Sequence, residues 1–519
     1  MGMVALAAKP LFEDCEWTFD TLKRVYAAIE EIALTELGLD VYPNQIEVIT
    51  AEQMLDAYSS IGMPLLYRHW SFGKRFAREE SRYRRGMQGL AYELVINASP
   101  CVSYVMEENS MTMQALVLAH AAFGHNHFFK NNYLFRQWTD AESILDYLTY
   151  AKAYVAKCED QHGIEAVESV LDGAHALMHY GVHRVGSRAK SRVADPRDRQ
   201  LARREYERRN YNDLWRTVPK TSVADAPENT PVDEAAKSPA DRGQLVLPEE
   251  NLLFFLEQHA PKLENWQREL LRVVQQIAQY FYPQRQTKVI NEGTATFVHY
   301  EIMNRLYDRG LIGEGAILEF LSSHSQVLYQ PEFDSPRYAG LNPYALGFAM
   351  MRDIQRLCEE PTSEDREWFP EIAGQGNALA VLRSAWADFR DESFILQYLS
   401  PKVIRDLRLF TLGDDANSSH YLVKAIHEER GYRDVRRALS RQYEIGSQDP
   451  DIQVAEVDLA GNRRLVLHHN VRDGVMLEKT QCDEVLVHLA RLWGYSVRLL
   501  EVDASTGKTL REHSAVPLP

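Results

Sequence analysis

The sequence EENSMTMQALVLAHAAFGHNH spans residues 107–127 and puts three histidines and two glutamates on or beside one apolar helix. These side chains are Glu107, Glu108, His120, His125 and His127. Neutral imidazole nitrogen is the commonest protein ligand for metals such as zinc, so histidines at this density are typical of a metal site. The alternative is a set of buried histidines that hydrogen-bond to backbone carbonyls. This stretch alone leaves both interpretations open.

The spacing of two of these histidines bears on the local helix geometry. His120 and His125 are five residues apart, which separates them by about 140° on a regular α-helix. That angle is too wide for both imidazoles to bind one ion without distortion. Gly124 precedes the second histidine and would permit a widened turn of the π type, which is frequent at functional sites.

The best candidate for a third ligand is Glu292, in the run NEGTA at residues 291–295. It lies near the start of a predicted helix, next to small residues that let another helix approach. Two histidines and one glutamate hold the ion in several zinc hydrolases, which keep one position open for water. The alternative is a carboxylate that stabilises a helix N-terminus through the macrodipole.

Further residues are candidates for catalysis or for support of the ligands. His299 follows Glu292 by seven residues, hence on the same helix face but about 10 Å along the axis. It is therefore better placed to contact a substrate or orient a ligand than to bind the same ion. Glu108 and His299 are the predicted catalytic residues, and Glu107, Glu108 and Glu301 are candidates for a general base by proximity in sequence. Residues expected to support the ligands or contact a substrate are Glu107, His127, His175, Asn291 and Glu301.

Length and composition narrow the class of protein. A chain of 519 residues exceeds one comfortable core, so two or three domains are expected. The net charge of -16 argues against general nucleic-acid or anionic-membrane binding as the main task and leaves local basic patches open, and no specific nucleic-acid partner is expected. The five cysteines never form a Cys-x-x-Cys pair, which excludes a cysteine zinc ribbon and fits a reducing compartment. No signal peptide and no long apolar run occur, so we expect a cytoplasmic protein without a membrane span.

Apolar periodicity predicts a mainly α fold, with a large helical domain that contains a short sheet or hairpin and a small C-terminal α+β domain. The predicted strands are residues 89–96, 452–459, 463–469 and 496–502. The predicted division is an N-terminal helical part of the core domain (1–218), a flexible linker or surface excursion (219–245), a second helical part completing the core (246–418) and the α+β module (419–519).

Helix boundaries are predicted from capping and helix-breaking residues. A capping box of Thr50 with Gln53 opens one helix, and Asn109 or Ser110 caps the histidine helix. Pro283 is expected to break the chain. The other predicted helices are 18–37, 140–158, 164–180, helices that resume at 249–256 and continue through 266 to 282, 288–309, stretches of 314–358, a region ending at Pro401, 423–439 and 480–493.

Two segments rich in basic residues keep two interpretations each. Aromatic and basic residues alternate over residues 67–76, which either line a ligand groove or start a helix whose aromatics pack in the core. The basic run over residues 184–216 is either a solvated helix face or a site for an acidic partner.

The segment HAAFGH at residues 120–125 resembles the metal-binding motif of dipeptidyl peptidase III, His-Glu-Leu-Leu-Gly-His. In that family a downstream helix supplies a glutamate ligand. The resemblance implies a divalent metal, with zinc as the expected ion, held by His120, His125 and Glu292. It also shows one departure, because Ala121 stands where that family has its general-base glutamate.

At the level of the whole chain, five blocks resemble the SpoVR family of stage V sporulation proteins. The resemblance extends from about residue 14 to the C-terminal module, and it implies a cytoplasmic bacterial protein linked to spore cortex formation in spore-formers. It further implies a gene neighbour that encodes a PrkA-type serine kinase. Thr294 stands where the family usually has tryptophan after the Glu-Gly pair. The five blocks are residues 42–49, 67–76, 107–132, 171–184 and 291–299.

These residues support two hypotheses for the function. The leading one is a metal-binding SpoVR-family protein, associated with sporulation or a stress response, that hydrolyses an amide in cell-wall or peptide metabolism. The alternative is a non-catalytic regulatory or scaffold protein that works with the PrkA-type kinase. Ala121, the basic run and the C-terminal module favour the alternative. The sequence indicates neither the substrate nor the oligomeric state.

Overall fold

The computed structural model describes residues 9–60, 63, 65–85, 93–184, 247–413, 422–424, 429–445, 449–458, 461–472 and 474–517. The predicted linker over 219–245 and all but the first residue of the basic run over 184–216 lie outside these residues. The chain forms two compact units, which are described separately. Unit 1 is drawn from residues 1–172 and 276–450, and unit 2 from residues 173–275 and 451–519. The four-part division predicted from the sequence stays a prediction.

The first half of unit 1 contains the predicted helix starts. Thr50 and Gln53 form the capping box, and the hydroxyl of Ser110 accepts a hydrogen bond from the Met113 amide at 3.1 Å. Both predictions are confirmed. Tyr67 and Phe72 are buried, as the core interpretation of residues 67–76 expected, whereas Trp70 of the same segment is 50% exposed. The helices are α1 (Phe19–Glu31), α2 (Ala51–Ser59), α3 (Trp70–Arg84), α4 (Met111–Leu118), α5 (Asn126–Asn131), α6 (Tyr133–Trp138), α7 (Ile144–His162), α8 (Ile164–Ala176, which continues into unit 2) and the π-helices η1 (Ile32–Glu36) and η2 (Ala119–His125).

A short sheet precedes the histidine helix. Its order is β1 (Asn44–Ile49), β3 (Cys101–Met106), β2 (Glu93–Ile96), with β1 parallel and β2 antiparallel to the central strand. All six residues of β3 are buried. The described part of the predicted strand over 89–96 is confirmed as β2. The strands β1 and β3 were not predicted.

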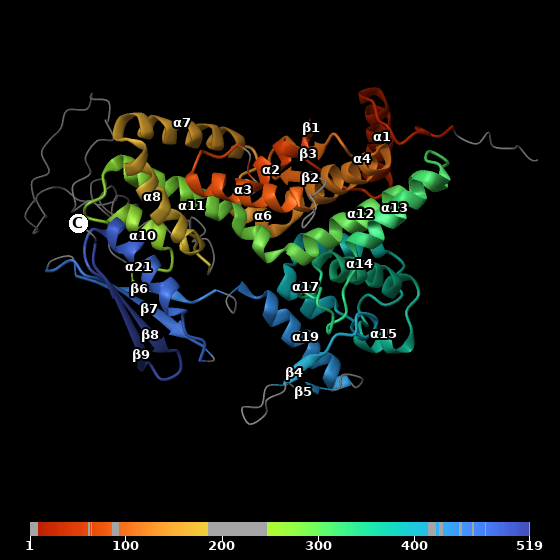
Figure 1. Ribbon diagram of the computed structural model, residues 1–519. Coiled ribbons are helices and arrows are strands. Elements are labelled where there is room, and N and C mark those ends of the chain that lie inside the picture. Colours follow the sequence, from red (N-terminus) through yellow and green to blue (C-terminus); the bar gives the residue numbers. More distant parts are fainter. Residues whose placement is uncertain are drawn as a thin grey trace, which may run out of the picture. The chain divides into compact units, whose positions relative to one another are not determined.

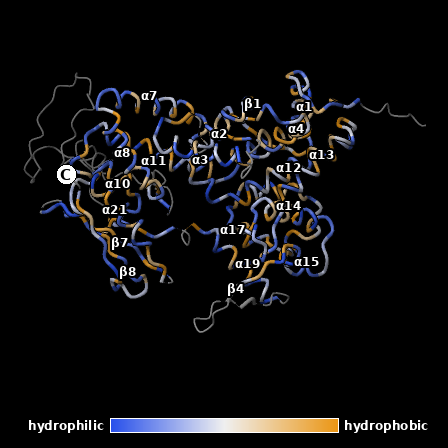
Figure 2. The backbone as a smooth tube through the Cα atoms, viewed as in Figure 1, coloured by the Kyte–Doolittle hydropathy of each residue, from blue (hydrophilic) through white to orange (hydrophobic). Residues whose placement is uncertain are grey.

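The helix that carries the histidines runs through the core of unit 1. Every residue of α4 and of η2 is buried. A helix that is apolar all round, as α4 nearly is, must be covered on all sides (Figure 2). The next segment, α5, continues it without a break, so the two candidate metal-binding histidines sit in the middle of one long buried helical rod.

The second half of unit 1 is helical and corrects three predicted boundaries. Pro283 does not break the chain, because α11 continues past it to Gln286; a proline removes one amide donor, and α11 ends within one turn of that loss. Pro401 begins a helix rather than ending one, and the start of the predicted helix over 423–439 is strand β5. The elements are α11 (Asn265–Gln286, which begins in unit 2), α12 (Lys288–Asp308), α13 (Glu314–Val327), α14 (Pro343–Glu359), α15 (Ser363–Trp368), α16 (Ala378–Asp388), α17 (Asp391–Tyr398), α18 (Pro401–Asp406), β4 (Thr411–Gly413), β5 (Leu422–Lys424) and α19 (Glu429–Tyr443).

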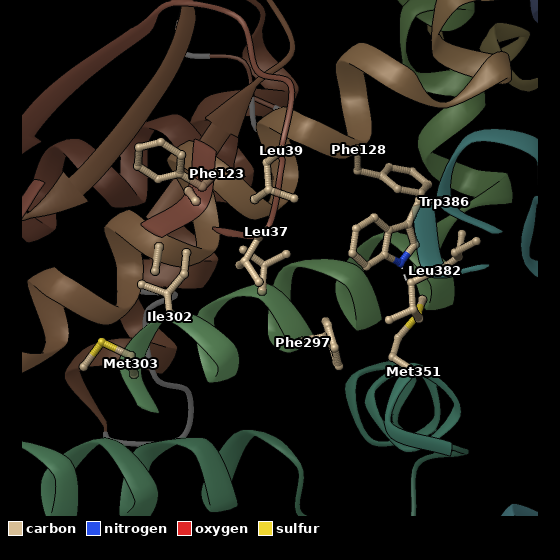
Figure 3. Packing of buried hydrophobic residues seen from close by; sticks show 14 of the residues in the cluster. Leu37, Leu39, Phe123, Phe128, Phe297, Ile302, Met303, Met351, Leu382 and Trp386 are labelled. Carbon is tan, nitrogen blue, oxygen red and sulfur yellow. Dashed lines mark hydrogen bonds between the residues drawn. The ribbon is translucent and has the colours of Figure 1, made fainter. Parts of the chain in front are cut away.

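The centre of unit 1 is the packing of α12 against η2 and α14. Close approach depends on glycine: a Cβ on Gly124 would lie 2.6 Å from the Cα of Ala295, and a Cβ on Gly293 would lie 2.6 Å from the backbone of Gly347. Around this contact lies a continuous hydrophobic core. Figure 3 shows part of it, where the Phe297 ring of α12 lies 6.2 Å from the Trp386 ring.

Unit 2 contains the part of the predicted α+β module from residue 451 onwards, and one strand that was not predicted. Its sheet has the order β6-β7-β8-β9, in which β7 and β8 are parallel and the outer pairs antiparallel, with α21 packed on β8 and β9 (Figure 1). The predicted hairpin is confirmed as β6 and β7, whereas β8 is not the last strand. The elements are η3 (Met178–Tyr180), α10 (Leu252–His259), β6 (Ile452–Val457), β7 (Leu465–Val471), α21 (Lys479–Trp493), β8 (Val497–Asp503) and β9 (Thr509–Ala515).

A buried carboxylate ties β9 to the rest of this sheet. Glu501 of β8 is fully buried and accepts hydrogen bonds from the Leu477 amide, from His469 and His513, and from Arg511. Burial alone would raise the pKa of Glu501, but these donors lower it to about 2. Arg511 and His513 of β9 both bond to this carboxylate, so polar contacts hold β9 in the sheet, and apolar periodicity does not reveal such contacts.

The predicted fold class is therefore confirmed: the protein is mainly α, with a short sheet in the helical part and a strand-containing C-terminal region. Within the described ranges, none of the helices combines the length and the apolar character that a bilayer crossing requires.

Replacing Gly347 by alanine tests the close contact between α12 and α14. The new Cβ would lie 2.3 Å from the Val289 carbonyl oxygen and 2.7 Å from the Gly293 Cα, and these backbone atoms cannot rotate away. We expect Gly347→Ala to destabilise the protein by about 1–3 kcal/mol, the usual cost of overpacking. Thermal unfolding followed by circular dichroism measures the effect.

The matched control is Gly315→Ala in α13, where a Cβ would meet nothing within 4 Å. Alanine there should leave the unfolding temperature unchanged or raise it slightly. Equal behaviour of the two variants would contradict the packing argument.

Candidate metal centre

Four side chains from three elements converge in unit 1. Glu93 comes from β2, His120 and His125 from η2, and Glu292 from α12. The Nε2 atom of His120 lies 3.7 Å from Glu93 Oε1 and 3.9 Å from Glu292 Oε2, and His125 Nε2 lies 3.5 Å from Glu292 Oε2. One ligand atom each from Glu93, His120 and His125 lie within 4.8 Å of one another. The predicted trio of His120, His125 and Glu292 is thus brought together, with Glu93 beside it.

The π-helix brings the two histidines to the same face. In a π-helix the hydrogen bond reaches five residues back, so residues five apart lie above one another. The ring centroids of His120 and His125 are 4.6 Å apart. The predicted widened turn is confirmed. Gly124 has a further role here, since any side chain on it would collide with Ala295 of the glutamate-bearing helix.

The hydrogen bond of His125 leaves two acceptors facing each other. Its Nδ1 lies 2.9 Å from Asn291 Oδ1, so neutral His125 donates its Nδ1 proton there and presents a lone pair at Nε2. Opposite that lone pair is Glu292 Oε2, a buried atom with no hydrogen-bond partner among the described residues. Two acceptors in this arrangement require a cation or a proton between them.

The distances fit a small cation. Two donor atoms at about 2.0–2.1 Å from a tetrahedral zinc ion are separated by roughly 3.3 Å. The observed separations of 3.5 and 3.9 Å from Glu292 Oε2 to the two histidines are close to that value. Imidazole and carboxylate are also the donor types that zinc accepts in catalytic sites. The residues present therefore fit a divalent metal.

The second carboxylate, Glu93, has an unusual environment. Burial and the neighbouring Glu292 raise the pKa of Glu93 to about 8. Burial, followed by these same two carboxylates, also raises the pKa of Tyr344, whose ring stacks on His120 at 6.4 Å. Tyr58 has a raised pKa for the same reasons, burial first. The carboxylates thus repel further negative charge at this site, and a bound cation would relieve that repulsion.

A chain of histidines extends from the cluster. His120 Nδ1 lies 2.9 Å from His299 Nδ1, and His299 Nε2 lies 2.9 Å from His324 Nδ1 of α13. Burial, and then the neighbouring imidazoles, hold the pKa of His120 and of His299 well below the usual range; burial lowers the pKa of His324 to about 4. His299 therefore contacts a candidate ligand, which agrees with its expected orienting position on α12.

Other predicted residues lie away from this cluster. Glu107 and Glu108 are exposed in the turn before α4, and Glu108 accepts a hydrogen bond from the Ala51 amide at 3.4 Å. His127 is buried but bonds to the Asp40 backbone at 3.0 Å, and burial lowers its pKa to about 4. Proximity in sequence did not bring these side chains to the histidines, because the helix direction carries them elsewhere.

Two further predicted residues have separate surroundings. Glu301 pairs with Arg305 at 2.6 Å and with Arg352 at 3.2 Å, so it is engaged in an ion-pair network on α12. His175 belongs to the part of α8 that is counted with unit 2. Neither is grouped with the histidine and glutamate cluster.

Sequence reasoning missed Glu93 and His324. A weak signal for Glu93 was present, because it is the only charged residue in the strand-like run over 89–96. Nothing in the spacing linked that strand to the histidine helix, because the pairing of β2 with β3 turns it back towards η2. His324 carries no motif at all and is recognised only by its hydrogen bond to His299.

Comparison with known proteins assigns the chain to a family. The family model described as SpoVR like protein matches residues 16–448, and that of the SpoVR-like C-terminal domain matches residues 450–504. The chain belongs to the SpoVR family. All the residues of the cluster lie within the first SpoVR match.

A close relative has a name that states no activity. This SpoVR-family chain is 53% identical over 484 residues to the "Uncharacterized protein YcgB" of Escherichia coli (strain K12), which covers 93% of this chain and 92% of the relative. No solved structure matches this SpoVR-family chain. The chemistry of the SpoVR cluster therefore has to be argued from its residues.

The raised pKa of Glu93 predicts a pH dependence for the metal-free SpoVR-family protein. Between the ordinary value of 4.5 and about 8, the unfolded chain ionises Glu93 while the folded chain keeps its proton. The folded state then binds more protons, so Glu93 makes stability fall as pH rises through this window. We expect Glu93→Gln to remove this contribution, so that stability at pH 8 improves relative to pH 5.

The measurement is the urea midpoint of wild type and variant at both pH values, with chelator present. The exposed Glu52→Gln is the control, since its carboxylate lies on the surface of α2. An unchanged difference between the two pH values in Glu93→Gln would show that this carboxyl does not carry the effect.

Proposed function

We propose that this SpoVR-family protein binds one divalent metal ion through His120, His125 and Glu292. The observation that carries the proposal is the buried, unpartnered Oε2 of Glu292, 3.5 Å from the lone pair of His125 Nε2. Asn291 supports the same arrangement, because its hydrogen bond fixes which nitrogen of His125 faces the carboxylate. Zinc is the expected ion, since two histidines and a glutamate form a common catalytic zinc site.

We further propose that the site hydrolyses an amide bond. A bound ion of this type lowers the pKa of a coordinated water towards 7. Ala121 cannot act as the general base, but Glu93 reaches the same histidines from β2, with its Oε1 atom 3.7 Å from His120 Nε2. A carboxylate beside a metal-bound water is suited to accept a proton from it and return that proton to the leaving amine. The proposed setting is the cell-wall or peptide metabolism of sporulation or stress, in the cytoplasm.

Metal content and site variants test this proposal. Purified protein reconstituted with zinc should hold about one ion per chain by plasma mass spectrometry, and zinc should raise the unfolding temperature. His125→Ala and Glu292→Gln should lose the ion. Glu93→Gln should keep it and lower hydrolysis of peptides and cell-wall stem peptides by about 10²–10⁴-fold, the usual contribution of a general base.

The control is His468→Gln on β7, a histidine outside the cluster, which should match wild type in both assays. Absence of zinc, iron and manganese from the wild type, even after reconstitution, would overturn metal binding. Retention of full hydrolysis by Glu93→Gln would overturn the role of Glu93.

Ala121 favours a second candidate function. It is fully buried at the position of the catalytic glutamate in the similar peptidase motif, so η2 itself supplies no base. A general base would not be needed if the metal had a structural role and the protein acted as a scaffold beside a PrkA-type kinase. Metal binding without hydrolysis of any amide tested, together with stable capture of the kinase, would favour this function.

A further inference from the structure

Three buried imidazoles form one hydrogen-bonded line through unit 1. His120 comes from η2, His299 from α12 and His324 from α13. The distance is 2.9 Å from His120 Nδ1 to His299 Nδ1 and again 2.9 Å from His299 Nε2 to His324 Nδ1. The three residues are 3%, 2% and 5% exposed, so water does not compete for these contacts. Both ring nitrogens of His299 are used, which leaves none for a metal.

If His120 binds an ion, every hydrogen bond in this line is donated in the same direction, from His120 towards His324. A metal ligand must offer the lone pair of Nε2, the atom that faces Glu93 and Glu292. The proton of neutral His120 is then on Nδ1 and is donated to His299 Nδ1. His299 must in turn carry its proton on Nε2 and donate it to His324 Nδ1. Each neutral imidazole has one donor and one acceptor, so each choice fixes the next.

The far end of the line is enclosed by aromatic rings. The His324 ring lies 5.2 Å from Tyr300, 5.5 Å from Phe320 and 4.8 Å from Phe348. These rings come from α12, α13 and α14 and hold the imidazole in one orientation. The acceptor nitrogen of His324 therefore points at His299 without side-chain freedom to turn away.

We propose that His299 and His324 are positioning residues, which hold His120 in the tautomer and orientation that bind the ion. The proposal rests on the proposed metal site and extends it two residues outwards. In this proposal His299 orients a metal-binding imidazole and does not bind the ion itself, a different role from the catalytic one expected from the sequence. Partners that orient a metal-binding imidazole typically account for about 10–100-fold in metal affinity.

Two substitutions of the same remote residue separate positioning from packing. His324→Leu removes the acceptor for the His299 proton, whereas His324→Asn offers an amide oxygen close to the position of Nδ1. We expect zinc affinity, measured by competition with a chelating dye, to fall about 10–100-fold in His324→Leu and to stay within about 3-fold of wild type in His324→Asn. The visible spectrum of the cobalt-loaded protein should change in His324→Leu only, because it reports the geometry of the ligands.

The wild-type protein provides a second measurement that needs no variant to fold. Nitrogen NMR of protein with ¹⁵N-labelled histidine distinguishes the two neutral tautomers of each ring. Zinc-loaded wild type should contain His120 protonated at Nδ1 and His299 protonated at Nε2. The reverse tautomer at His299 would overturn the proposal. The chain has 17 histidines, so the signals of His120 and His299 are identified in the wild type by the coupling across their mutual hydrogen bond.

The outcomes distinguish this proposal from the metal site itself. If wild type binds zinc, His125→Ala does not, and folded His324→Leu binds as tightly as wild type, the positioning proposal fails and the metal site stands. If wild type binds no metal, both fail. Equal loss of affinity in the leucine and asparagine variants would also overturn the proposal, because the effect would then follow packing rather than the acceptor.

Discussion

The rest of unit 1 depends on one close approach: the backbone of α12 approaches the backbones of η2 and α14 to van der Waals distance. Each of the two contacts requires glycine. Gly124 of η2 faces α12 on one side, and Gly293 of α12 faces Gly347 of α14 on the other. At this distance the short carboxylate arm of Glu292 reaches histidines on another helix. Small residues thus control the geometry of a polar site that they do not themselves form.

Much of this arrangement was predictable, because its signals are local. Capping by Thr50 and Ser110 depends on a few neighbouring residues, and both were confirmed. The pairing of Glu292 with the histidines was predicted from chemistry: few carboxylates of the chain stand among residues as small as Gly293 and Ala295. The widened turn was predicted from a spacing that a regular helix cannot use. The metal and its reaction stay predictions.

The features that sequence reasoning missed are non-local or polar. Glu93 reaches the cluster through strand pairing, which no spacing along the chain records. β9 was missed because its buried positions include His513, which is satisfied by Glu501 rather than by apolar contact. Glu108 was chosen for being near in sequence, but its carboxylate instead accepts a hydrogen bond from the Ala51 amide at the start of α2. Distance along the chain is a poor guide to distance in space once a segment leaves its helix.

The π-helix has a consequence for the whole helical rod as well as for the two histidines. Relative to a continuous α-helix it accommodates one extra residue, which corresponds to a rotation of about 100° between the helical segments on its two sides. Upstream, Gln114 bonds to the Met106 carbonyl; downstream, Asn126 bonds to the Tyr42 backbone. In a regular α-helix with Gln114 directed at Met106, the Asn126 side chain would be rotated away from Tyr42. The π segment therefore corrects the rotation of the helix between its two halves, so that one continuous helical rod contacts both Met106 and Tyr42.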